Sequence, residues 1–273
     1  MAGAKTHQFH ILPPSIWPLI GAFSSLAMAA GGIMWMHDVP FGGYVFFAGL
    51  IAVLYTFFSW WADVIREANS GDHTPIVQLH LRYGMIMFIA SEVMFFVAWF
   101  WAFFNASLFP SVVESVGGQW PPTGIETIDP FAFPLLNTML LLCSGTAVTW
   151  AHHSIINGDR RGLMQGLLLT IALGVVFSAV QAYEYIHAPF AFKGNIYGAT
   201  FFMATGFHGF HVIVGTIFLA VCYFRARGGD FTPRQHFGFE AAAWYWHFVD
   251  VVWLFLFVAV YVWGGWGAPI HGG

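Results

Sequence analysis

The sequence is poor in charged residues, and this shortage excludes most classes of soluble protein. Only 8% of its 273 residues are Asp, Glu, Lys or Arg, whereas 58% are hydrophobic. A soluble domain carries about 25% charged residues, so this chain has too few ionic groups to keep the surface of a globule of its size hydrated. Disordered chains and ordinary cytosolic enzymes are excluded for this reason. The composition predicts a polytopic membrane protein.

Cationic tracts and paired cysteines are also missing. Nine Lys and Arg stand against 13 Asp and Glu, and no basic run of the kind that binds nucleic acid occurs. The two cysteines, Cys143 and Cys222, lie in separate apolar runs. Their separation disfavours a disulfide framework or a thiolate metal site, and we interpret both as small buried hydrophobic residues.

Seven apolar stretches are long enough to cross the ~30 Å hydrocarbon core as helices. We expect them roughly at residues 15–35, 44–62, 77–104, 135–151, 162–183, 197–224 and 239–263. They predict an all-α fold with one membrane domain. The first stretch has some features of a signal peptide, with a small-residue site at 27–29, but it continues to Trp35 and we predict a retained span.

The distribution of Lys and Arg predicts the orientation. Counted by alternate sides of the seven spans, eight of the nine cationic residues fall on one side and only Lys193 falls on the other. Cytoplasmic loops carry the excess of Lys and Arg. The N-terminus is therefore predicted on the cytoplasmic or matrix side, and the C-terminus on the periplasmic or intermembrane side.

Ionisable side chains inside the spans are candidate functional groups, because a charge in hydrocarbon is costly. Glu92 lies ~12 Å along the third span, near the midplane, and should be protonated or hydrogen-bonded. It is either a proton-relay or lipid-facing carboxyl, or a neutral acid that joins two helices. His208 and His211 share one face of the sixth span, and we expect one of them to contact Glu92 rather than the two to bind a metal. His247 and Asp250 have the same spacing in the last span and can form a buried pair.

A cluster of aromatic and charged residues is predicted at the inner membrane surface. Trp60 and Trp61 end the second span, and Arg66 and Glu67 follow them. Tryptophan at headgroup depth beside Arg and His is favourable for phospholipid phosphate and glycerol groups. A generic inner loop rich in cations would have a similar composition.

Several blocks of the sequence resemble cytochrome c oxidase subunit III. They are residues 60–67 (WWADVIRE), 91–96 (SEVMFF), 120–125 (WPPTGI), 149–154 (TWAHHS), 158–160 (GDR), 204–211 (ATGFHGFH) and 240–257 (EAAAWYWHFVDVVWLFLF). The resemblance extends from Pro14 to Gly264, and so many independent blocks in this order make a chance match implausible.

The resemblance implies a fold of seven helices in two bundles, helices 1–2 and helices 3–7, which form a V-shaped, lipid-filled cleft. The corresponding division of the chain is 1–70 and 71–273. Glu92 matches the buried glutamate of the family's third helix. The residues that the resemblance assigns to lipid binding are Trp60, Trp61, Glu67, His73, Arg82, Arg225 and His236.

The resemblance also implies a non-catalytic core subunit of a respiratory cytochrome c oxidase. Such a subunit binds phospholipids, stabilises the haem–copper catalytic subunit I and supports sustained proton uptake during oxygen reduction. The expected partners are subunit I, subunit II, small subunits and membrane phospholipids, with no nucleic acid. No haem, copper or other metal is expected on this chain, and haem and copper belong to the partner subunits. The expected location is the bacterial inner (plasma) membrane or the mitochondrial inner membrane.

Proton uptake requires titratable groups at the inner surface. Histidine titrates near neutral pH, so a cluster of histidines and carboxylates can collect and pass protons. From the polar residues of the predicted inner face we select His7 and His10 as the groups nearest to proton uptake.

Two other functions are compatible with fewer of these features. A di-iron membrane enzyme needs several histidine clusters on one membrane face. His152 and His153 lie at the inner end of the fourth span, whereas His208 and His211 lie within the sixth, roughly 20 Å or more away by helix rise. The other alternative is an independent proton channel that uses Glu92 in the third span and Asp250 in the seventh.

Overall fold

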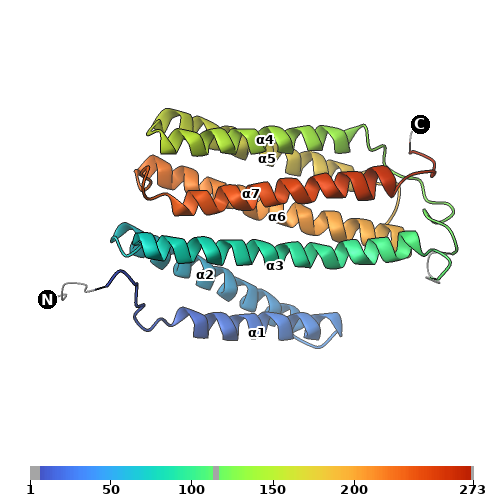
Figure 1. Ribbon diagram of the computed structural model, residues 1–273. Helices are drawn as coiled ribbons and strands as arrows, with labels where there is room; N and C mark the ends of the chain where they lie inside the picture. The colour runs from blue at the N-terminus through green and yellow to red at the C-terminus, as the bar shows by residue number, and fades with distance from the viewer. Residues whose placement is uncertain (1–6, 113–116, 272–273) are drawn as a thin grey trace. The chain divides into compact units, whose positions relative to one another are not determined.

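The computed structural model describes residues 7–112 and 117–271, and their regular structure is helical (Figure 1). Seven helices in this part of the chain are long and apolar enough to cross a membrane, which confirms the predicted all-α, seven-span fold. The elements are α1 (Trp17–Met36), α2 (Gly42–Asn69), α3 (Pro75–Leu108), α4 (Phe133–Ile156), α5 (Arg160–Ile186), α6 (Ile196–Gly228), α7 (Phe237–Leu256) and η2 (Phe257–Trp263).

The chain divides into two compact units, Met1–Leu81 and Arg82–Gly273, and the junction lies within α3. Helices α1 and α2 belong to the first unit, and most of α3 together with α4 to α7 belongs to the second. This grouping agrees with the two bundles expected from the sequence. The domain division at residue 70 stays a prediction.

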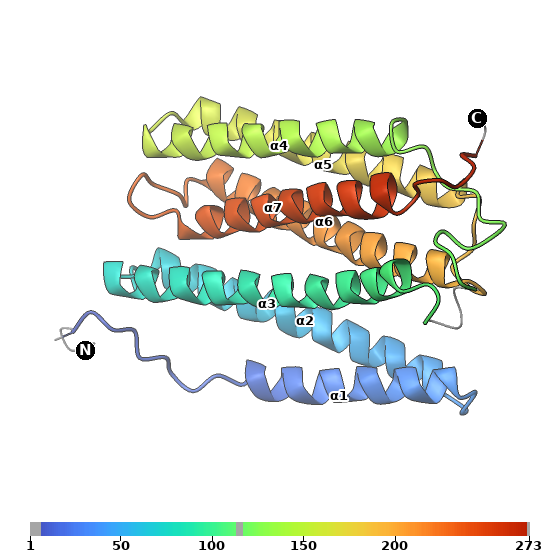
Figure 2. The ribbon, with the colours of Figure 1, turned by 45° about the vertical axis from the view of Figure 1, so that its right-hand side comes forward.

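The first unit is a helical hairpin in which α1 and α2 approach closely, and an extended segment precedes α1 (Figure 2). Three glycines make the approach possible. A Cβ atom on Gly31 would overlap the backbone of Phe46, and one on Gly49 would overlap the backbone of Met28. Gly42 meets the backbone at Trp35 in the same way. Only glycine lets the two backbones pack at this distance.

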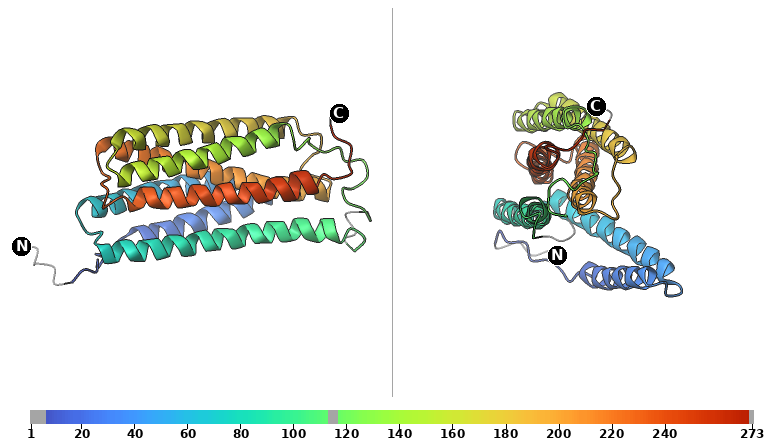
Figure 3. Two further views of the ribbon diagram at one scale, coloured as in Figure 1. Left: turned by 45° about the horizontal axis from the view of Figure 1, so that its top comes forward. Right: turned by 90° about the vertical axis from the view of Figure 1, so that its right-hand side faces the viewer.

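Helix α7 lies at the centre of the second unit. Figure 3 shows the ribbon in two further views. Trp246 and Trp253 are fully buried, and each indole N–H donates a hydrogen bond to α4. Trp246 Nε1 donates to Ser144 Oγ over 2.8 Å, and Trp253 Nε1 donates to Thr138 Oγ1 over 2.9 Å. Buried indoles need such partners in an apolar core. These bonds fix the register of α7 against α4.

Hydrogen bonds join the α3–α4 connection to the C-terminal tail. Trp120 Nε1 donates to the Gly264 carbonyl over 2.9 Å, and the Thr127 backbone N–H donates to Pro269 O over 2.9 Å. The Trp120 ring also packs at 5.4 Å from Phe103 and from Tyr197. The long connection is therefore anchored to the end of the bundle.

Helix boundaries extend beyond the apolar stretches that predicted them. Helix α5 begins at Arg160 because the Asp159 carboxylate caps the backbone N–H groups of Arg161 and Gly162 over 3.0 and 3.1 Å. A side-chain cap of this kind satisfies donors that the helix itself leaves unpaired. Polar residues at the ends of a span can thus remain helical. A prediction based on apolar residues alone therefore makes such a helix too short.

Candidate functional site

The expected contact between Glu92 and a histidine of the sixth span is present. His211 Nε2 lies 2.9 Å from Glu92 Oε2, and its Nδ1 lies 2.6 Å from the Phe207 carbonyl oxygen. A carbonyl oxygen only accepts, so Nδ1 carries a proton. The contact with Glu92 then holds one proton, either on the carboxyl or on the imidazole. The pair has no net charge in either arrangement, which lowers the cost of placing it in a membrane span.

Aromatic rings surround the His211 side chain. The ring of Phe96 is centred 5.0 Å from the imidazole, and those of Tyr245 and Phe248 lie at 6.2 and 6.1 Å. His211 is buried, whereas the Glu92 side chain remains about a quarter exposed, at 23%. The pair therefore joins α3 to α6 at the edge of the aromatic core, and the carboxyl is its accessible end.

His208 does not join this pair, although it shares a helix face with His211. Its Nε2 lies 3.1 Å from the Val249 carbonyl oxygen on α7, and the ring packs against Phe177 and Trp253. His208 Nδ1 is buried and has no hydrogen-bond partner among the described residues. The histidine connects α6 to α7.

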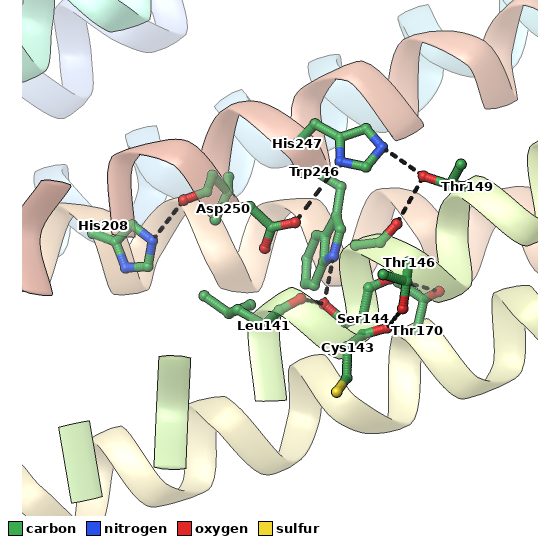
Figure 4. A network of polar contacts seen from close by, with 12 residues as sticks. Leu141, Cys143, Ser144, Thr146, Thr149, Thr170, His208, Trp246, His247 and Asp250 are labelled. Carbon is green, nitrogen blue, oxygen red and sulfur yellow. Dashed lines mark hydrogen bonds and ion pairs between the residues drawn. The ribbon is translucent and has the colours of Figure 1, made fainter. Parts of the chain in front are cut away.

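Figure 4 shows the polar contacts that surround His247 and Asp250. His247 Nδ1 lies 3.8 Å from Asp250 Oδ2, and Nε2 lies 3.1 Å from Thr149 Oγ1 on α4. The Asp250 carboxylate is buried and packs directly on Gly145, where a Cβ atom would overlap it. The ionisable residues predicted inside the spans thus form separate contacts that link α3 to α6, α6 to α7 and α7 to α4.

A fourth polar cluster, which sequence reasoning missed, lies between α4, α5 and η2. Tyr261 donates its hydroxyl proton to Glu184 Oε1 over 2.7 Å, and Gln181 Nε2 donates to the same oxygen over 3.0 Å. Asn137 Nδ2 donates to Gln181 Oε1 over 3.1 Å. The predicted fifth span ended at Tyr183, so Glu184 fell outside it. Its spacing of three residues from Gln181 was the available signal.

Arg82, which the sequence assigned to lipid contact, is engaged by Glu240. The guanidinium Nε lies 3.0 Å from each carboxylate oxygen, and Nη2 lies 2.8 Å from Oε2. Arg225 likewise pairs with Asp230 at 3.2 Å and lies 4.5 Å over the ring of Phe231. Both cations of the second unit's proposed lipid set are therefore neutralised within the unit.

His236, the third member of that set in the second unit, immediately precedes α7. Its Nδ1 lies 3.0 Å from the Thr232 carbonyl oxygen, and its ring is centred 5.5 Å from that of His152. The His152 ring also meets Phe239 edge-on at 5.8 Å. The two imidazoles thus pack where the end of α4 meets the start of α7.

Polar side chains gather at the end of the first unit that carries the α2–α3 turn. His10 Nε2 lies 3.6 Å from Glu67 Oε2, and its Nδ1 lies 3.9 Å from Asp72 Oδ1. His7 Nδ1 lies 3.1 Å from the Phe9 carbonyl oxygen. The backbone carbonyl of His73 accepts from Gln78 Nε2 over 3.1 Å. The structure thus brings together His10 and Glu67, which the sequence assigned to different roles.

Trp60 and Trp61 lie on the last turns of α2 and are both exposed. Near them, Trp17 Nε1 donates to Asp63 Oδ2 over 2.5 Å, and Arg66 pairs with Asp63. The Asp63 carboxylate thus joins the start of α1 to the end of α2.

In residues 7–112 and 117–271, no group of three or more His, Cys, Asp or Glu side chains is placed to hold a metal ion.

The chain matches a family of known proteins over nearly its whole length. The family described as cytochrome c oxidase subunit III matches residues 7–265. Cytochrome c oxidase subunit 3 of Marchantia polymorpha is 57% identical over 266 residues, which cover 97% of this chain and 100% of the relative. The subunits of Arabidopsis thaliana and Bos taurus are each 55% identical, over 97% and 95% of this chain and 100% and 98% of their own lengths. The chain therefore belongs to the cytochrome c oxidase subunit III family and is a multi-pass membrane subunit of that oxidase.

Proposed function

We propose that this subunit binds phospholipids and sustains proton uptake by the oxidase, while haem and copper reside in partner subunits. Subunit I, which holds the haem–copper centre, is the partner that it stabilises, and subunit II and small subunits complete the assembly. The membrane is the bacterial plasma membrane or the mitochondrial inner membrane. The N-terminus lies on the cytoplasmic or matrix side, and the C-terminus lies on the periplasmic or intermembrane side.

The observation that carries the proton proposal is the position of His10 between two carboxylates. With distances of 3.6 and 3.9 Å to Glu67 and Asp72, the ring can exchange a proton with either side after a small shift. His7 lies three residues earlier in the same extended segment and presents a second titratable ring. Histidine takes up and releases protons near neutral pH, so this group suits a surface that collects protons.

The lipid proposal is supported by the exposed Trp60 and Trp61 beside the same charged turn. Indole rings favour the level of the headgroups because their apolar body and polar N–H match that region. Arg82 and Arg225 belong to the same proposed set, and each also has a carboxylate partner within the second unit. In the second unit, Arg82, Arg225 and His236 remain the proposed headgroup contacts, and their ion pairs and hydrogen bonds hold them in place.

The proton proposal is tested in the complete oxidase with His7→Ala and His10→Ala combined. We expect the rate of proton uptake during turnover to fall at high pH, where bulk protons are scarce, with the haem content unchanged. His37→Ala is the matched control, because His37 lies at the other end of the same hairpin. An unchanged rate in the double variant would overturn the proposal.

The lipid proposal has its own test, in which Trp60→Ala and Trp61→Ala are combined. Mass spectrometry of the purified complex should then detect fewer retained phospholipids. The haem content of the same complexes shows whether the subunit still assembles with its haem-containing partner. Equal lipid retention by this variant and the wild type would contradict the lipid role while leaving the proton role standing.

A further inference from the structure

An open hollow lies beside the turn between α1 and α2, and four of its eight lining residues are aromatic. The hollow has a volume of about 440 Å³, and its lining includes Trp35, Phe41, Tyr44, Phe47 and Asp38. It lies at the end of the hairpin that carries the α1–α2 turn, whereas the proposed lipid and proton groups of this unit lie at the other end. The proposed function leaves this hollow without a role.

The aromatic walls leave much of their ring surface available. The Trp35 and Phe47 rings are centred 5.6 Å apart at an interplanar angle of 52°, and the Phe41 and Tyr44 rings are 6.4 Å apart at 43°. Phe41 and Tyr44 are 74% and 79% exposed. Because the paired rings are tilted rather than stacked, they do not cover one another's faces. Exposed π faces carry negative potential and attract cations.

The carboxylate of Asp38 has no cationic residue near it in the sequence. No Lys or Arg occurs between Lys5 and Arg66, and Arg66 lies near the far end of α2. A carboxylate at the end of two membrane spans, with no Lys or Arg at its own end of the hairpin, is electrostatically suited to an external cation. The four rings and this single negative charge therefore favour the same kind of ligand.

The backbone of the turn is strained at Phe41, one of the lining residues. Phe41 has φ of 66°, a region that bulky side chains rarely adopt, whereas Asp38, with φ of 55°, is of a residue type that tolerates it. Glycine would adopt this conformation at Phe41 at lower cost. The sequence nevertheless places an aromatic ring there, and strain of this kind often marks a ligand site.

We propose that this hollow binds the quaternary ammonium headgroup of phosphatidylcholine from the adjacent leaflet. Aromatic faces around a single carboxylate recognise a trimethylammonium group through cation–π attraction and charge. A primary ammonium has three N–H donors that need acceptors, and the aromatic walls offer few. Both helices are membrane spans, so their shared turn lies at headgroup depth. The orientation proposed above makes this the outer leaflet.

The complete oxidase in nanodiscs of pure phosphatidylcholine, phosphatidylethanolamine or phosphatidylglycerol, with identical acyl chains, tests the proposal. Hydrogen–deuterium exchange of residues 37–43 reports on this turn alone. We expect exchange to be roughly three- to tenfold slower in phosphatidylcholine than in the other two lipids. Trp35→Leu and Asp38→Asn should each abolish the difference. Trp266→Leu, at an exposed tryptophan outside the hollow, should retain it.

Three results would overturn the proposal. They are equal exchange in all three lipids, equal protection by phosphatidylethanolamine, and protection by phosphatidylcholine that survives both variants. If Trp35→Leu does not assemble, Tyr44→Leu carries the same expectation, because the highly exposed Tyr44 side chain contributes little to the hairpin core. The reporter is distant from the groups tested for proton uptake, so failure here leaves the proposed function intact.

Discussion

The buried cluster between α4, α5 and η2 allows the contribution of one hydroxyl to be isolated. The Tyr261 hydroxyl donates to Glu184 Oε1 over 2.7 Å and accepts from Gln181 Nε2 over 3.2 Å. Tyr261→Phe removes only that oxygen and keeps the ring. Two buried hydrogen bonds disappear, each with a net value of about 1 kcal/mol, so we expect a loss of about 2 kcal/mol. For a domain of this size, that corresponds to roughly 4–8 °C in melting temperature.

Thermal dissociation of the subunit from the purified oxidase measures this effect. Tyr197→Phe is the matched control, because Tyr197 is also buried in the second unit and its hydroxyl has no hydrogen bond to a described residue. We expect the control to dissociate within about 2 °C of the wild type. If both variants dissociate at the same temperature, the hydroxyl of Tyr261 contributes nothing and the reasoning is wrong.

Combining Tyr261→Phe with Glu184→Leu, which removes the acceptor, measures the coupling directly. The two residues share a hydrogen bond, so their effects should be non-additive by about 1 kcal/mol. If the two losses of stability are additive, Glu184 and Tyr261 act independently, although the Tyr261 hydroxyl lies 2.7 Å from Glu184 Oε1.

Three further predictions concern helix contacts, and each is read from the same dissociation assay. Glu92→Gln keeps an acceptor for His211 and should be mild, whereas Glu92→Leu leaves a buried imidazole nitrogen unpaired and should cost about 1–3 kcal/mol. Gly49→Ala should separate α1 from α2 and lower assembly, while Gly84→Ala, with open space around it, should be neutral or stabilising by up to about 1 kcal/mol. Glu240→Gln should destabilise the complex by about 1 kcal/mol, because Arg82 loses its counter-charge but is partly exposed and keeps one acceptor. Equal effects of each variant and its counterpart, or no effect at Glu240, would contradict these expectations.

The sequence predicted the spans well because membrane thickness imposes a simple length rule on apolar segments. It also predicted the contact of Glu92, since a midplane carboxyl requires a partner and the sixth span offered two histidines on one face. The spacing alone did not show which of the two histidines would contact Glu92. In the structure, His211 contacts Glu92 and His208 contacts the Val249 carbonyl oxygen of α7.

Charge pairing across helices escaped prediction for a different reason. Arg82 and Glu240 are 158 residues apart, and each is ordinary in its own segment. A cation near the inner end of a span fits both a lipid headgroup and an ion pair. Only the packing of α3 against α7 brings the two side chains together. Glu184 was missed because a length rule ended the span just before it, although an acid may lie inside a helix when a hydroxyl and an amide bond to it.

The two units use their polar residues in opposite ways. In the second unit, acids meet a base or a hydrogen-bond donor from another helix, as in the pairs of Glu92 with His211 and Arg82 with Glu240. Such pairs join helices and carry no net charge into the membrane, which favours a scaffolding role. In the first unit, the α1–α2 contact is made by glycines, and the charged residues lie at the two ends of the hairpin. Exchange with lipids and protons is therefore expected from the first unit. Variants that loosen the second unit should impair assembly before they alter that exchange.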